Sequence, residues 1–408
     1  MGTHCVTPIR KSLQANIDRV APLADCLTLA CLRLVFVGLL VGLPSFPCLA
    51  QTNSPRKQTI AQLASEARTE GRVVVWGPPG EAIRKAMTEG FKRAFPDIGI
   101  EYSGARGGEQ ATRIKAERDG GVYSVDVMLS GTTTAINQMK PVKALDPIMP
   151  VLVLPEVTDP KKWRGGKLEF SDETTRLNLV FSTMVKAPLV YNPKLAKPGE
   201  IDELPKLLDP KWKGKFVIND PLPSGSGNVT FRWIWQVMGP EKAKDYYRRI
   251  RANVAVADRD QRRQIEWVAQ GKYAFLLAPS DGTLGQLIAR GLKLGILPEF
   301  KDYGTYVTAS FGSAMLLNRR PHPSAAAVFL NWLLTREGQT AWSKAMEHVS
   351  RRLDVPTDHL PPYIIPPPDA KFFSAERKPG YRYWLSYTEE NVQRSAEETK
   401  ILTELFGR

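Results

Sequence analysis

Short apolar runs alternate with stretches of helical periodicity in the first third of the chain. The expected strands are short and mainly apolar, whereas apolar side chains recur every three or four positions in the expected helices. The strands are predicted at residues 73–76, 98–102 and 125–129, and the helices at residues 60–70, 82–95 and 113–118. This alternation predicts a parallel sheet with helices on both faces.

A second α/β series follows later in the chain. Strands are predicted at residues 216–218 and 273–277, and helices at residues 229–238, 241–250 and 262–270. A further strand at 313–317 and a helix at 324–335 come next, then a proline-rich stretch, 356–379, that predicts little regular structure, and a polar helix at 389–406. About 350 residues arranged in two such series indicate two domains.

The first 50 residues have the features of an export signal. Basic residues up to Arg33 precede an apolar run at 34–43, and Cys48-Leu49-Ala50 provides a small-residue cleavage site before Gln51. The run is shorter than the roughly 20 residues that span a bilayer, so we expect a removed signal peptide at 1–50 and a periplasmic protein, with a retained membrane anchor as the alternative. All four cysteines lie in this leader, at positions 5, 26, 31 and 48.

Composition narrows the chemistry that the mature protein can perform. Removing the leader lowers the formal charge from +14 to +12, which favours anionic ligands. No cysteine remains as a nucleophile, and neither a Gly-x-Ser-x-Gly motif nor a phosphate loop is present. The three remaining histidines, His322, His348 and His359, have no metal-ligand spacing, and His322 between two prolines indicates a turn. We therefore expect no metal, no cofactor and no enzymatic activity.

Three predicted strands end in glycine- and hydroxyl-rich turns that lead into helices. Because the first N–H groups of a helix have no internal partner, such turns offer donors at the carboxyl edge of a sheet, where open α/β folds bind ligands. The alternative is that the same side chains cap their helices. The candidate ligand-binding residues are Ser130, Thr132, Ser226, Asn228, Ser280 and Asp281, with Trp76 and Arg259 as additions. Trp76 could equally belong to the core.

Two further patterns favour structural explanations over binding. The arginine groups 248–251, 262–263 and 351–352 are short and lack interleaved aromatic residues, so we expect solvated helix faces and no nucleic-acid partner. Tyr246 and Tyr247 could suggest ligands for ferric iron, but they lie in a predicted helix. Packing of one tyrosine and solvation of the other is the simpler interpretation.

Several segments, in the same order along the chain, resemble the extracellular solute-binding proteins of ABC importers, in the branch that includes the ferric-iron-binding proteins. They are residues 73–77, 125–131, 189–193, 209–216, 267–274 and 322–339, of which the last is the most specific. The resemblance implies a type II periplasmic-binding-protein fold, in which two lobes, each with a mainly parallel sheet flanked by helices, are joined by crossing strands and close on a ligand. We expect one lobe at 58–193 plus 308–408 and the other at 194–307.

The resemblance also indicates a monomeric carrier that delivers its ligand to an ABC permease in the inner membrane. The iron binders have a tandem tyrosine pair after a strand of the second lobe, where this chain has residues 277–281 without tyrosine. A small organic or phosphonate-like anion suits the basic, hydroxyl-rich loops better. Ferric iron transport, a sensor role without transport and a secreted hydrolase using Ser226 or Ser280 are the alternatives.

Overall fold

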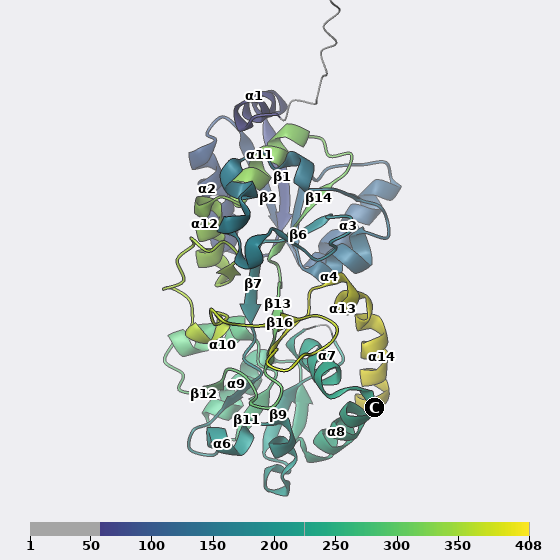
Figure 1. Cartoon of the computed structure of the whole chain (residues 1–408), viewed down its shortest axis with the longest axis vertical. Coiled ribbons are helices and arrows are strands. Elements are labelled where there is room, and N and C mark those ends of the chain that lie inside the picture. The colour runs from purple at the N-terminus through teal and green to yellow at the C-terminus, as the bar shows by residue number, and fades with distance from the viewer. Residues whose placement is uncertain (1–57, 224, 408) are drawn as a thin grey trace, which may run out of the picture. The chain divides into compact units, whose positions relative to one another are not determined.

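The computed structural model describes residues 58–407 except Ser224, and of Asp281 it describes the backbone alone. The expected signal peptide at 1–50 therefore lies outside the described residues. Within them, the strands form three sheets, one with seven strands and two with five strands each. Figure 1 shows helices packed around these sheets.

The seven-stranded sheet combines parallel and antiparallel strands. In pairing order it consists of β2 (Gly99–Gly104), β1 (Arg72–Gly77), β3 (Val127–Ser130), β14 (Ser313–Leu317), β6 (Asn178–Val180) and β5 (Glu169–Phe170), with β4 (Leu145–Asp146) beside β14. The first three strands are parallel, as the sequence predicts, and β14 is antiparallel to β3. Within this sheet, the strands of the first α/β series have the expected parallel arrangement, and β14, which returns from a distant part of the chain, runs in the opposite direction.

Helices cover both faces of this sheet because successive side chains of each strand point to opposite faces. Val73 and Val75 of β1 face a core cluster that Met87 and Phe329 also join, whereas Trp76 faces another cluster. The helices are α1 (Ile60–Glu70), α2 (Glu81–Ala94), α3 (Gly107–Asp119), α4 (Thr132–Thr134) with the adjoining η1 (Ala135–Met139), α11 (Pro323–Leu333) and α12 (Arg336–Met346). His322 lies at the N-cap of α11, and its ring Nδ1 is 2.9 Å from Asp126 Oδ2, so the turn expected there is also an anchor point.

The first five-stranded sheet is built mostly from the second α/β series. Its order is β10 (Val256–Asp258), β9 (Phe216–Asn219), β11 (Phe275–Leu277), β8 (Leu189–Tyr191) and β12 (Gly295–Leu297). Its helices are α7 (Ser226–Met238), α8 (Pro240–Asn253), α9 (Gln261–Ala269) and α10 (Asp281–Ala289). The lobe boundaries remain a prediction, and β8 pairs with β11 of this sheet although it precedes the predicted boundary at 193.

The other five-stranded sheet contains the two segments by which the chain passes between the sheets already described. Its order is β15 (Val349–Ser350), β7 (Ser182–Val185), β13 (Thr305–Thr308), β17 (Tyr383–Leu385) and β16 (Phe372–Phe373). β7 connects β6 to β8, and β13 connects β12 to β14, with β7 and β13 paired antiparallel. Gly312, immediately before β14, has no room for a side chain, because a Cβ there would lie 2.2 Å from the carbonyl oxygen of Ser182.

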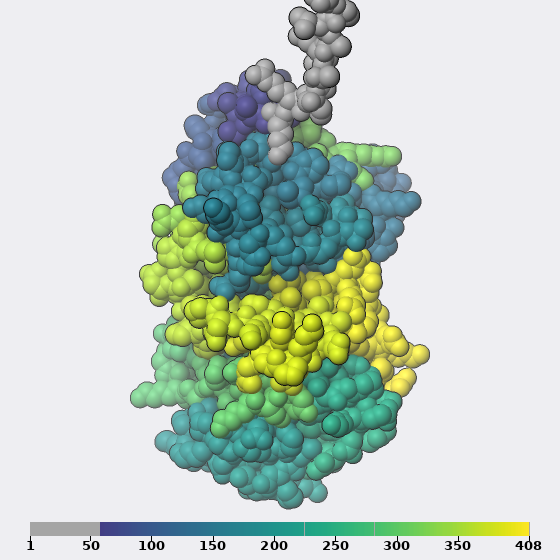
Figure 2. Space-filling model, in the orientation of Figure 1, coloured from purple at the N-terminus to yellow at the C-terminus, as the bar shows by residue number. Residues whose placement is uncertain are grey.

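The C-terminal segment is more ordered than its proline content predicts. Residues 356–379 contain the short helix η7 (Pro362–Ile364) and strand β16, and the expected helix at 389–406 is divided into α13 (Glu389–Gln393) and α14 (Ser395–Phe406). Helix α13 contacts α4 and η1, whereas α14 contacts α7 and α8. Figure 2 shows this segment, in yellow, between the blue and green parts of the chain.

Both tyrosines of the 246–247 pair belong to the core, so the expectation that one would be solvated is wrong. Tyr246 is 3% and Tyr247 0% exposed. The Tyr247 hydroxyl donates to the carbonyl of Phe231, and burial raises the pKa of both phenols well above the usual value. Helix α8 is covered by α7, by α14 and by the short helix η5 (Leu204–Leu208), so two of its faces are buried.

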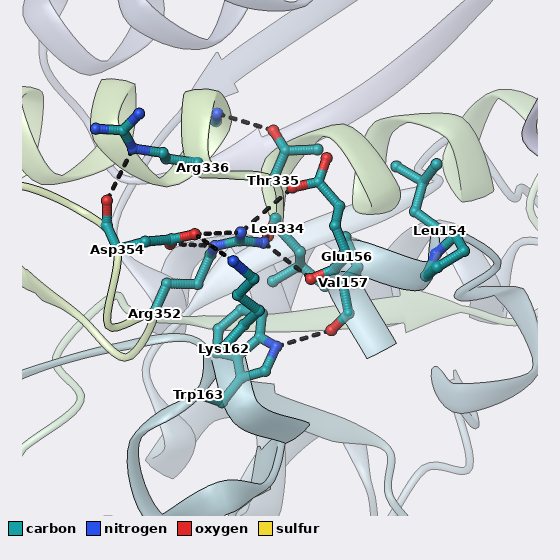
Figure 3. A network of polar contacts seen from close by, with 12 residues as sticks. Leu154, Glu156, Val157, Lys162, Trp163, Leu334, Thr335, Arg336, Arg352 and Asp354 are labelled. Carbon is teal, nitrogen blue, oxygen red and sulfur yellow. Dashed lines mark hydrogen bonds and ion pairs between the residues drawn. The ribbon is translucent and has the colours of Figure 1, made fainter. Parts of the chain in front are cut away.

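The arginines at 351–352 are buried, in contrast to the solvated helix faces expected for them. Arg352 contacts Glu156 and Asp354 at 3.2 and 2.9 Å, and its Nη1 donates to the carbonyl of Leu334 (Figure 3). The network spans the short helices α5 (Pro155–Thr158) and η3 (Pro160–Lys162). The arginines of α8 and α9 are exposed, as predicted. Four further short helices complete the described part of the chain: η2 (Met149–Val151), η4 (Arg164–Gly166), α6 (Pro198–Ile201) and η6 (Pro210–Trp212).

Candidate functional site

Two of the predicted turns lie side by side at one edge of the first five-stranded sheet. Strands β9 and β11 are parallel neighbours, with Ile218 opposite Leu277, so the turns after them emerge at the same edge. Ser226 is the first residue of α7, and Ser280 is the N-cap of α10. The cap residue of α7 is Gly225, so Ser226 follows the cap, and the Ser280 side chain makes no cap hydrogen bond to α10. Capping therefore does not explain Ser280.

The turn before α7 is held by hydrogen bonds of its own. The Asn219 side chain accepts from the Gly227 amide at 3.2 Å, and the Asn228 side chain donates to the Pro221 carbonyl at 3.0 Å. The amide of Asn228 also lies 3.0 Å from the hydroxyl of Thr399 in α14. Asn228 therefore links the predicted binding turn to the C-terminal helix.

Arg259 comes to the same edge because β10 is parallel to β9. Its Nε donates to Asp220 Oδ2 at 2.8 Å, while the side chain is 69% exposed. Asp220 Oδ1 accepts from the Leu222 amide, so this carboxylate also stabilises its own turn. Burial alone would raise the pKa of neighbouring Asp258, but hydrogen bonds from the Asp260 and Arg259 amides and from the Arg263 guanidinium lower it overall.

The third turn lies at the carboxyl edge of the seven-stranded sheet. The Ser130 hydroxyl is buried and has no hydrogen-bond partner among the described residues, and a Cβ at Gly107 would come within 2.2 Å of it. Thr132 opens α4 and is buried. Trp76, at the end of β1, is 6% exposed in the core, and the Arg113 guanidinium lies 4.6 Å from its ring centroid. These three residues share one sheet edge, and all three are buried.

The helices α13 and α14 connect the two groups of turns. Helix α13 contacts α4, which starts at Thr132, and α14 contacts α7, which starts at Ser226. Lys140 of the segment after η1 pairs with Glu389 of α13 at 2.5 Å. The side chain of Asp281 is outside what the structure describes, so its place at this site stays a prediction.

Sequence reasoning missed a buried pair of basic residues beside the crossing strand β7. Burial lowers the pKa of Lys186 to about 7, and burial together with the charge of Lys186 lowers the pKa of His348 to about 3. The Lys186 carbonyl accepts from the Thr305 hydroxyl, which fixes the backbone there. A lysine inside the otherwise uncharged stretch 177–192 was the available signal in the sequence.

The sequence profile of the bacterial extracellular solute-binding proteins matches residues 76–340. The chain belongs to this family. A comparison with curated proteins found no match to this chain. Across residues 58–407 (Ser224 excepted), no helix is long and apolar enough to cross a membrane, and no three histidine, cysteine or acidic side chains are grouped as a metal site requires.

Solved structures with a similar fold cover most of the solute-binding protein. The iron- and citrate-bound protein from Trichodesmium is 20% identical, covers 83% of this chain and 99% of its own, and has a TM-score of 0.60. The apo ferric ion-binding protein A of Pasteurella haemolytica is 14% identical with 82% and 98% coverage and a TM-score of 0.61. The fructose-6-phosphate-bound binding protein of Actinobacillus pleuropneumoniae is 19% identical, with 82% and 97% coverage and a TM-score of 0.53. These similarities establish the two-lobe periplasmic-binding fold.

Proposed function

We propose that this solute-binding protein captures a small organic or phosphonate-like anion between its two lobes in the periplasm and delivers it to an ABC permease. The observation that carries the proposal is the pair of helix starts at Ser226 and Ser280, which follow adjacent parallel strands and receive no side-chain hydrogen bond from their own cap residues. Helix N-termini with free N–H groups favour negative charge. Arg259, exposed at the same edge, adds a cation that an anion can share with Asp220.

Neutral donors suit a carrier that must also release its ligand. Hydroxyls and N–H groups bind an anion without burying a full opposing charge, which is costly unless the charge is well paired. The fructose-6-phosphate bound to the Actinobacillus relative is an anion with an organic part, which supports a ligand of this class. Ser130 and Thr132 would contribute from the seven-stranded sheet.

Ferric iron is the alternative that the similar iron-binding structures favour. Iron requires a converging set of oxygen ligands such as tyrosinates and carboxylates. The tandem pair Tyr246 and Tyr247 lies in the core, where burial opposes ionisation of both phenols. The turn after β11 contains Ser280 in place of a tyrosine. These observations support the organic anion over iron.

A hydrolase using Ser226 or Ser280 would need a base within hydrogen-bond reach. In the described part of the chain, no hydrogen bond joins either serine to a histidine, and His322 is held by Asp126. Family membership supports a carrier without catalysis. We therefore propose that the protein serves transport. Genes for a permease and an ATPase in the same operon would support transport, and their absence would favour a sensor role.

A thermal-shift screen tests the proposed ligand class. Organic acids, phosphonates, polyamines and ferric citrate are added separately, and a bound ligand raises the melting temperature by mass action. We expect a shift with an organic acid or phosphonate. A shift with ferric salts together with a tyrosinate-to-iron absorption band would contradict the anion proposal.

Serine variants then test the site. Ser226→Ala and Ser280→Ala each remove one hydrogen bond to a charged ligand, worth roughly 1.5–3 kcal/mol, so the Kd should rise about tenfold to a hundredfold. Ser65→Ala, an exposed residue of α1, is the matched control and should leave the Kd unchanged. Unchanged affinity in both site variants would remove these turns from the binding site.

A further inference from the structure

A basic cavity lies at the sheet edge opposite the proposed ligand site. Its volume is about 310 Å³, and it lies between the end of α3, the start of β3 and the end of β14. Tyr123 precedes β3, whereas Arg319 follows the antiparallel β14, so both belong to the amino edge of the parallel strands. The candidate serines and threonine follow the carboxyl ends of their strands.

The cavity is lined by more positive charge than the surrounding chain neutralises. Lys115, Arg118, Lys143 and Arg319 line it, and Asp119 is the acid among the lining residues. Over the range 58–407, no carboxylate that the structure describes lies within the 4.0 Å ion-pair distance of any of these four cations. Unpaired cations that share one cavity favour an anionic ligand.

The two arginines are held in place before any ligand arrives. The guanidinium groups of Arg118 and Arg319 lie 5.1 and 5.2 Å from the ring centroid of Tyr123. Arg118 donates to the side chain and carbonyl of Asn318 at 2.7 and 2.8 Å, and Arg319 donates to the Tyr123 hydroxyl at 2.6 Å. Asn318 in turn donates to the Lys143 carbonyl. Side chains fixed in this way lose little entropy when they bind.

The rim of the cavity is apolar as well as basic. Val142 lines the cavity and is 42% exposed, and nearby Val122 is 52% exposed. Large apolar side chains at this level of exposure are uncommon among the described residues, and both lie beside the cations. Guanidinium groups bind phosphate oxygens in bidentate geometry, and the valines can contact an attached organic portion.

We propose that this cavity is a second, separate anion site that binds the phosphate group of a phosphoester. The shared chemistry is a phosphate oxyanion attached to an apolar or glycerol portion. A soluble phosphoester and the headgroup of an anionic phospholipid both present it. The site is independent of the proposed ligand site, because the two lie at opposite edges of the strands.

Binding of two probes by the whole protein distinguishes a soluble phosphoester from the headgroup of an anionic phospholipid. Glycerol phosphate is titrated by calorimetry, and co-sedimentation is measured with phosphatidylcholine vesicles that contain or lack phosphatidylglycerol. Heat with glycerol phosphate indicates a soluble phosphoester, whereas co-sedimentation that requires phosphatidylglycerol indicates a lipid headgroup. Either result supports the site if the variants below abolish it, and the absence of both overturns the proposal.

Charge-matched variants assign the binding to this cavity. Lys115→Gln with Arg319→Asn removes two cations, and Asn tolerates the left-handed backbone of Arg319 at φ 53°. We expect at least about tenfold weaker binding. Lys92→Gln with Arg93→Asn, on the exposed end of α2, removes the same charge and should change binding less than about twofold.

Equal losses in the two double variants would overturn the proposal, since they would indicate a general effect of net charge. Lys115→Gln alone disrupts no described hydrogen bond and should weaken binding in the same direction if the double variant folds poorly. Ser226→Ala should leave phosphoester binding at this cavity unchanged. Loss of binding in that variant would place the phosphoester at the other site and contradict the proposal.

Discussion

Buried arginines in this protein have partners far away in the sequence as well as nearby. Arg352 is 3% exposed and reaches Glu156, which is 196 residues earlier. Arg351 similarly contacts Glu169 at 3.1 Å. Asp354 is a local partner of Arg352, but the neighbouring residues contain no sign of Glu156 or Glu169, which is why the pattern of basic residues predicted a solvated surface. The tertiary fold decides whether such an arginine is exposed.

Replacing Arg352 should therefore destabilise the protein more than replacing an exposed arginine. Arg352→Met removes the guanidinium group that lies over the Trp163 ring and leaves the Leu334 carbonyl without its donor, and we expect a loss of about 2–3 kcal/mol in the free energy of unfolding. Arg262→Met removes a surface pair with Glu266 and should cost less than about 1 kcal/mol. Urea denaturation measures both, and equal losses would contradict the burial argument.

The buried His348 should make the protein sensitive to acid. Because its pKa falls to about 3 in the folded protein, the unfolded chain binds a proton more readily once the pH drops below about 6.5. The free energy of unfolding should decrease as the pH is lowered from about 6.5 to 3, and His348→Gln should reduce this decrease. Chemical denaturation at pH 7 and pH 4 measures the difference, with His359→Gln as the control. If the free energy of unfolding had the same pH dependence in the wild type and in His348→Gln, His348 would not be the cause of the acid sensitivity.

At the scale of elements, α14 is attached to α7 by a buried ion pair. Arg232 Nε lies 2.5 Å from Glu398 Oε2, and both side chains are less than a tenth exposed. Arg232 also donates to the carbonyl of Asn391 in α13. The pair therefore fixes both C-terminal helices to α7, next to the turn that contains Ser226.

Breaking this pair on one side should cost more than removing it entirely. Glu398→Leu leaves the Arg232 charge buried without its carboxylate, and we expect a loss of about 3–5 kcal/mol. Arg232→Met combined with Glu398→Leu should recover part of this loss, because no isolated charge remains. Denaturant unfolding of the two single variants and the double variant measures the coupling. Additive losses would contradict a direct interaction.

Elements with a strong local pattern were predictable, and those defined by pairing were not. The apolar runs of β1, β3, β9 and β14 and the periodicity of α2 and α11 specify each element without distant partners. β7 and β13 contain buried polar residues whose strand partners are distant in the sequence: Ser182 and Thr183 pair with β15, and Thr305 pairs with β17. Likewise, Ser226 and Ser280 could be identified as turn residues, but their shared edge depends on the pairing of β9 with β11.

At the scale of the whole molecule, the paired strands β7 and β13 form the connection at which the two lobes would rotate. Hinge closure around a ligand is a general motion of two-domain binding folds. With the ligand identified by the thermal-shift screen, solution X-ray scattering should show a smaller radius of gyration than without it. A radius that does not change at saturating ligand would indicate a rigid particle and contradict capture by closure.

Strand β14 has a consequence for the order in which the chain can fold. It lies between β3 and β6 in the seven-stranded sheet, yet more than 130 residues separate Val180 from Ser313. During synthesis the N-terminal residues emerge first. The middle strand of this sheet is therefore missing until the residues up to Leu317 have emerged. Such long-range pairing slows folding. The first α/β series remains open during synthesis, a state suited to a chain that crosses a membrane before it folds.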